Sequence, residues 1–120
     1  MPRRSFSESF RDAWTGLVFC VRSQRNMQIH LVAAAAVLMA VFWLGLSRIE
    51  LAVVVFAISF VLVAEMFNTA VEKTIDLYTT AYHPIARLAK HIAAGAVLIA
   101  AVNAVATGLL VILPHIQALW

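Results

Sequence analysis

Residues 92–113 read IAAGAVLIAAVNAVATGLLVIL, a run of 22 residues without a formally charged side chain. A helix needs about 20 predominantly apolar residues to cross a bilayer. We therefore expect a membrane-spanning helix over residues 88–113, ended by Pro114, because proline interrupts helical hydrogen bonding. Residues 31–46, LVAAAAVLMAVFWLGL, predict another span over residues 29–46 in the same way.

A further apolar run, LAVVVFAISFVLVA at residues 51–64, has only 14 residues and is too short to span by itself. It reaches full length if the helix continues beyond it, so we predict one helix over residues 49–78. The chain is then a single all-α membrane domain, residues 1–120, with three transmembrane helices. Its composition agrees, because 63% of the residues are hydrophobic and 12% are charged, whereas soluble domains are roughly 45–50% apolar.

The distribution of basic residues predicts the orientation, since short cytoplasmic loops collect Lys and Arg. Five arginines precede the first span, and the second connection contains Lys73, Arg87 and Lys90. We therefore expect a cytoplasmic N-terminus and an external C-terminus. The net charge of +3 is explained by this bias and by anionic headgroups, and we expect no nucleic-acid partner.

Residues 5–22 differ from the spans and predict an amphipathic helix on the cytoplasmic membrane surface. Ser5 and Glu8 have the spacing of a capping box. Apolar side chains then recur at helical intervals, with Trp14 expected at headgroup level.

Residues 64–77, AEMFNTAVEKTIDL, contain the most informative polar pattern. At about 100° per residue, Glu65, Asn68, Glu72 and Asp76 fall within an arc of about 80° on one helix face. Exposing ionised groups to lipid tails costs about 2.5–3.5 kcal/mol each, so this face should line a site enclosed by protein.

This acidic face predicts phosphoryl transfer. A carboxylate at the apolar edge, Glu65, can accept a proton from a hydroxyl, and one nearer the water, Glu72, can hold Mg²⁺ shared with phosphates. Lys90 can offset phosphate charge, as transfer from ATP requires. Two alternatives remain open on the residues alone: ion pairing with a neighbouring helix, and proton-coupled transport.

Four motifs resemble the prokaryotic integral-membrane diacylglycerol kinase and undecaprenol kinase family over nearly the whole chain. They are Phe10-x-x-Ala13-x-x-Gly16, the segment RNMQIH at 25–30, the segment Glu65-x-x-NTAVE at 65–72, and the segment AKHIAAGAVL at 89–98. The resemblance implies an ATP-dependent lipid kinase of the bacterial inner membrane. It also implies a homotrimer with active sites shared between subunits, and we expect neighbouring subunits to complete the enclosure of the acidic face.

The resemblance also implies individual roles. Glu65 matches the catalytic base and Asn68 a residue that positions the reacting phosphate, while Glu72 matches a metal ligand. Lys90 matches a contact to the nucleotide phosphates. The other candidate nucleotide-binding residues are Tyr82, His83, Asp76 and His91.

Two positions depart from the family pattern: Gln24 and His91 stand where a metal-binding Glu and an Asp are usual. Both changes raise the local positive charge, and Gln24 offers Mg²⁺ only a neutral oxygen, so we expect weaker metal binding. A low-activity or repurposed member that binds lipid or nucleotide is therefore an alternative. The residues of these motifs resemble the undecaprenol-preferring branch of the family more than the diacylglycerol-preferring branch, which favours undecaprenol as the acceptor. We expect His30 to be an interfacial hydrogen-bonding residue and Arg87 a headgroup contact.

Overall fold

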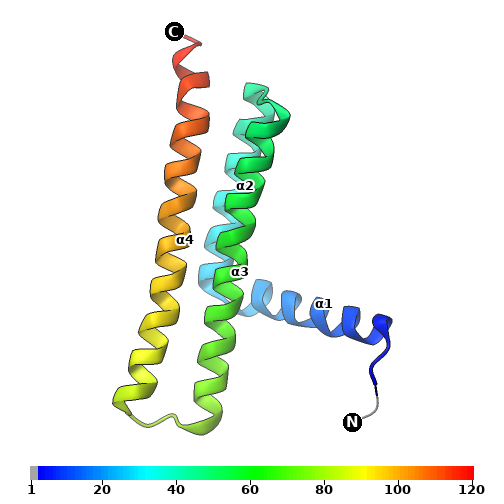
Figure 1. The fold of residues 1–120 in the computed structure, drawn as a ribbon, viewed down its shortest axis with the longest axis vertical. Coiled ribbons are helices and arrows are strands. Elements are labelled where there is room, and N and C mark those ends of the chain that lie inside the picture. The colour runs from blue at the N-terminus through cyan, green and yellow to red at the C-terminus, as the bar shows by residue number, and fades with distance from the viewer. Residues whose placement is uncertain (1–2) are drawn as a thin grey trace.

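The computed structural model describes residues 3–120, which form four helices and no strand. They are α1 (Phe6–Ser23), α2 (Arg25–Leu44), α3 (Arg48–Tyr78) and α4 (Pro84–Gln117). The last three lie side by side, and α1 projects away from them at a steep angle from the start of α2 (Figure 1). Each of the three is long and apolar enough to cross a membrane, which confirms the predicted all-α, multi-pass membrane protein.

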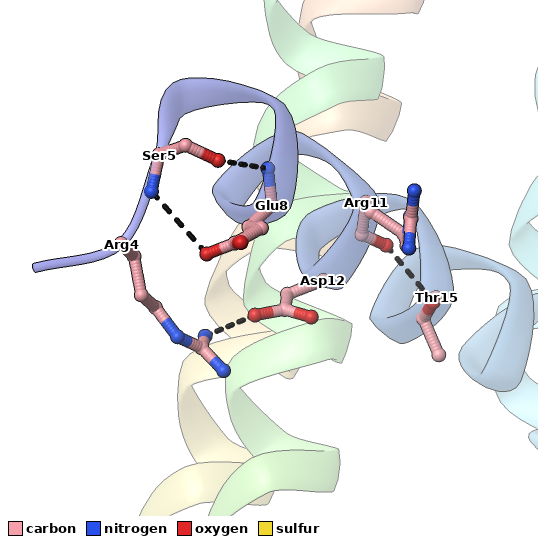
Figure 2. A network of polar contacts seen from close by, with 6 residues as sticks. All are labelled: Arg4, Ser5, Glu8, Arg11, Asp12 and Thr15. Carbon is pink, nitrogen blue, oxygen red and sulfur yellow. Dashed lines mark hydrogen bonds and ion pairs between the residues drawn. The ribbon is translucent and has the colours of Figure 1, made fainter. Parts of the chain in front are cut away.

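α1 begins with the predicted capping box (Figure 2). Ser5 Oγ accepts a hydrogen bond from the Glu8 backbone N–H at 3.3 Å, and the Ser5 N–H donates to Glu8 Oε2 at 3.3 Å. Arg4 pairs with Asp12 on the next turn. The apolar side chains of this helix remain largely exposed within the chain: Phe6, Phe10, Trp14 and Leu17.

The corner between α1 and α2 is fixed by side-chain contacts. Gln24 has an extended backbone there, and Gln28 Nε2 donates to the carbonyl oxygens of Val21 (3.1 Å) and Arg22 (3.2 Å). Cys20 and Met27 are buried at this corner. The helix of the first span therefore begins at Arg25, before the predicted residue 29, and its first turn belongs to the corner.

The turn between α2 and α3 depends on Gly45. Gly45 has φ +70°, a left-handed conformation that glycine adopts without steric cost, and it ends α2 at Leu44, two residues before the predicted end. Ser47 and Glu50 then form a second capping box that starts α3. The tight turn sets α2 and α3 antiparallel (Figure 1).

α4 is longer than predicted at both ends. It starts at Pro84, because proline suits the first helical position and because His83 Nδ1 accepts a hydrogen bond from the Ile85 N–H at 3.1 Å. The predicted end at Pro114 is wrong, since the helix continues to Gln117. Pro114 removes only one helical hydrogen bond, and bonding resumes where the Ala118 N–H donates to the Pro114 carbonyl at 3.1 Å.

α3 packs most extensively against α4. The buried apolar positions of these two helices are Val54, Ala57 and Val61 on α3 and Ala100 on α4, and two of the four are alanine. Small residues let membrane helices approach closely. This packing places the acidic face of α3 beside the start of α2 and the start of α4.

Candidate active site

The acidic face of α3 passes from buried to exposed along one uninterrupted helix. Glu65 is 2% exposed and Asn68 7%, whereas Glu72 is half-buried and Asp76 exposed. The chain alone buries Glu65 and Asn68, so the expectation that neighbouring subunits are needed to enclose the face is wrong for these two residues. The open end of the face is the end toward the α3–α4 loop.

Hydrogen bonds connect the polar residues of this face. Asn68 Nδ2 donates to Glu72 Oε1 at 3.4 Å, and Thr69 Oγ1 donates to the Glu65 carbonyl at 3.0 Å. Among the described residues, two buried side-chain oxygens have no hydrogen-bond partner: Glu65 Oε2 and Asn68 Oδ1. A buried oxygen without a partner is costly, so these two atoms mark the place where a ligand would supply the missing hydrogen bonds.

His30 reaches this site from α2. Its Nε2 lies 3.8 Å from Glu65 Oε2, and its side chain is 23% exposed. The sequence suggested only an interfacial role for His30. The sequence shows that His30 lies at the start of an apolar span. It does not show that the side chain is turned toward Glu65, because this orientation depends on how α2 packs against α3.

An apolar cavity of about 490 Å³ lies between α2, α3 and α4. Its lining includes His30 and Val37 on α2, Val61 on α3, and Gly108 and Ile116 on α4. These residues extend from the α1 side of the bundle to the C-terminal end of α4. The cavity can therefore receive a long apolar chain with its polar end near Glu65.

A second cavity, of about 440 Å³, lies at the α3–α4 loop. It gathers four of the predicted nucleotide-binding residues, Tyr82, His83, Lys90 and His91. Asp76, the fifth, forms an ion pair with Lys90, with 2.9 Å between Asp76 Oδ1 and Lys90 Nζ. The side chains that surround this cavity suit an anion with an aromatic or polar group attached.

Arg87 also lines the second cavity, which sequence reasoning missed by treating it as a headgroup contact. The sequence contained a signal for this role of Arg87. Arg87, Lys90 and His91 have the i, i+3, i+4 spacing that places side chains on one helix face. Three basic or potentially basic side chains therefore face one space, a better match to a polyphosphate than to a single charge.

The predicted metal ligands, Glu72 and Gln24, lie on α3 and at the α1–α2 corner. Residues 3–120 contain no group of three or more His, Cys, Asp or Glu side chains suited to a metal ion. Gln24 Nε2 donates to Ser23 Oγ at 3.2 Å. The oxygens of Glu72 and Asn68 are hard ligands, and Mg²⁺ commonly uses one or two carboxylates with substrate phosphates and water. The donors thus fit a magnesium ion that arrives with a nucleotide.

This chain is similar in sequence to a known family and to several of its members. The sequence model of the prokaryotic diacylglycerol kinase family matches residues 11–112. The chain is 42% identical over 111 residues to an undecaprenol kinase of Bacillus subtilis, covering 92% of this chain and 90% of that protein. It is 41% identical over 112 residues to a diacylglycerol kinase of Synechocystis, covering 92% of this chain and 64% of that one. Identity to the Escherichia coli diacylglycerol kinase is 26% over 103 residues, covering 86% of this chain and 84% of that protein.

Proposed function

Because this chain belongs to the prokaryotic diacylglycerol kinase family and is a membrane lipid kinase, we propose that it transfers the γ-phosphate of MgATP to a membrane lipid alcohol. The observation that carries the proposal is that Glu65 Oε2 is buried and has no hydrogen-bond partner among the described residues. Glu65 lies on α3, and the exposed end of α3 reaches the second cavity, which is lined by Arg87, Lys90 and His91 and is called the basic cavity below. One end of this face suits a lipid hydroxyl and the other suits a nucleotide.

In the proposed reaction Glu65 is the general base. It takes the proton of the lipid hydroxyl as the hydroxyl oxygen forms a bond to the γ-phosphorus. The bond between that phosphorus and the β-γ bridging oxygen breaks, and ADP leaves. Proton transfer of this kind needs a base within hydrogen-bond reach of the hydroxyl, and Glu65 Oε2 is free to be that base.

The remaining site residues bind and orient the nucleotide. Lys90 keeps two ammonium donors for phosphate while it pairs with Asp76, and Tyr82, His83 and His91 surround the nucleoside. Glu72, with Gln24 as a neutral oxygen donor, would hold the magnesium ion that accompanies ATP, and Asn68 would position the reacting phosphate. When bound, the ion would supply positive charge beside the phosphates.

We favour undecaprenol over diacylglycerol as the acceptor. Undecaprenol has one long polyprenyl chain, whereas diacylglycerol has two acyl chains. The apolar cavity is lined by all three spanning helices, from His30 at one end to Ile116 at the other, and we propose that it receives the single polyprenyl chain.

The proposed setting is a homotrimer in the bacterial inner membrane with a cytoplasmic N-terminus. The basic residues before α2 and in the α3–α4 loop support this orientation. The exposed apolar side chains of α1 support its placement at the cytoplasmic interface. The half-buried Glu72 and exposed Asp76 leave an open side that an adjoining subunit would cover.

Transfer of labelled phosphate from ATP to undecaprenol and to diacylglycerol in mixed micelles, with and without Mg²⁺, tests the proposal. We expect magnesium-dependent product with both lipids and faster turnover with undecaprenol. ATP binding without product from either lipid would instead indicate a member of the family that has lost the reaction.

A further inference from the structure

The separation of His30 and Glu65 is informative because it is too long for a direct hydrogen bond. Nε2 of His30 and Oε2 of Glu65 are 3.8 Å apart, beyond the range of about 2.7–3.2 Å for a hydrogen bond between nitrogen and oxygen. A third atom can satisfy both, since a single oxygen about 2.8 Å from each fits between them. The pair therefore outlines a position for one hydroxyl group.

The surroundings indicate what carries that hydroxyl. Glu65 is 2% exposed and its Oε2 is unpartnered among the described residues, so it is not satisfied by solvent. His30 is at once the neighbour of this oxygen and part of the lining of the apolar cavity. A group bound between the two would continue directly into apolar space, as the head of a long-chain alcohol does.

We propose that His30 and Glu65 together bind the acceptor hydroxyl, and that His30 is thus a substrate-positioning residue of the kinase. This inference rests on the proposed function. The hydroxyl donates to Glu65 Oε2 and accepts a hydrogen bond from His30 Nε2–H. Its second lone pair is left to face the γ-phosphorus.

This arrangement gives His30 a part in the transfer step without moving its own proton. The hydroxyl proton goes to Glu65, the new oxygen–phosphorus bond forms, and the bond to the departing ADP breaks. The Nε2–H of His30 stays hydrogen-bonded to the attacking oxygen and fixes its direction. Holding the attacking oxygen in line with the γ-phosphorus favours the reaction because the geometry of attack is set before the reaction begins.

The test compares His30→Leu, which removes the donor, with His30→Gln, which retains one on a side chain of similar reach. We expect His30→Leu to lower kcat/KM for the lipid by roughly 10- to 100-fold, the usual range for a lost hydrogen bond to a charged or reacting group. The KM for ATP should stay unchanged, and His30→Gln should recover most of the activity. Ile29→Ala, at an exposed neighbour on α2, is the matched control and should behave as wild type.

A second readout covers the case in which His30→Leu fails to fold. His30→Ala leaves a space beside Glu65, and added imidazole should restore lipid phosphorylation in this variant but not accelerate the wild type. Unchanged lipid kinetics in His30→Leu, or equal impairment of the Gln and Leu variants with normal KM for ATP, would overturn the inference. A wild type that phosphorylates no lipid would instead overturn the proposed function.

Discussion

His115 Nε2 lies 2.8 Å from Glu50 Oε2 and joins the last turns of α4 to the first turn of α3 across 65 residues of sequence. Both side chains are about one-third exposed, at 30% and 33%. Glu50 also accepts the Ser47 N–H of its capping box at 3.2 Å. The contact holds the segment beyond Pro114 against the bundle and explains why α4 persists past the proline.

The first prediction concerns this contact. Glu50→Ala should lower the melting temperature of the detergent-solubilised protein by a few degrees, because it removes both the side-chain half of the capping box and the bond to His115. His115→Ala removes only the second interaction and should have a smaller effect. Thermal unfolding followed by circular dichroism checks both variants. Equal stability of wild type and Glu50→Ala would contradict the proposed structural role.

Glu65→Gln should reduce lipid phosphorylation by about 10²- to 10⁴-fold, the usual contribution of a general base. Because Glu65 lies away from the basic cavity, the KM for ATP should be unaffected. Glu8→Gln, in the capping box of α1, is the control and should retain full turnover, since Gln can also serve in such a box. Retained activity in Glu65→Gln would exclude this carboxylate as the base.

The basic cavity predicts a different kinetic signature. Lys90→Ala and Arg87→Ala should each raise the KM for ATP by about tenfold, as expected for the loss of a charge-assisted hydrogen bond. The KM for the lipid should not change. Initial rates at varied ATP and fixed lipid measure the effect. If Arg87→Ala matches wild type, Arg87 is only a headgroup contact after all.

Reversion of the two unusual residues tests their role in metal binding. Gln24→Glu should lower the magnesium concentration that gives half-maximal rate, since a carboxylate binds Mg²⁺ better than a neutral amide. His91→Asp should act in the same direction by removing a potential positive charge near the phosphates. Magnesium titrations of each variant and of the pair give the answer. Identical titrations for all four proteins would show that neither residue influences the metal.

The turn between α2 and α3 provides a stability test independent of catalysis. Gly45→Ala should destabilise the protein by roughly 1–2 kcal/mol, because an L-residue is strained at φ +70°. Gly16→Ala, in the helical region of α1 with open space at the added Cβ, should be neutral or slightly stabilising. Denaturation by sodium dodecyl sulfate compares the two. A neutral Gly45→Ala variant would mean that the turn relaxes.

Much of the architecture is local and could be predicted from the sequence. The three apolar runs specify spanning helices because bilayer thickness sets the length of a span, and the spacing of Glu65, Asn68, Glu72 and Asp76 follows from the helical repeat. The boundaries were less accurate. The α1–α2 corner extends α2 backward to Arg25, and His83 and Pro84 start α4 earlier than its apolar run.

The sequence by itself determined that the chain would cross a membrane three times and carry a row of polar groups on its middle span, since both depend on residues close together in the chain. Only the tertiary structure decided that Glu65 is buried without a second subunit, that His30 faces it, and that His115 meets Glu50. The reason is that such contacts depend on how each helix is rotated and shifted against the next. Packing of small side chains fixes that arrangement, and hydrophobicity along one helix does not encode it.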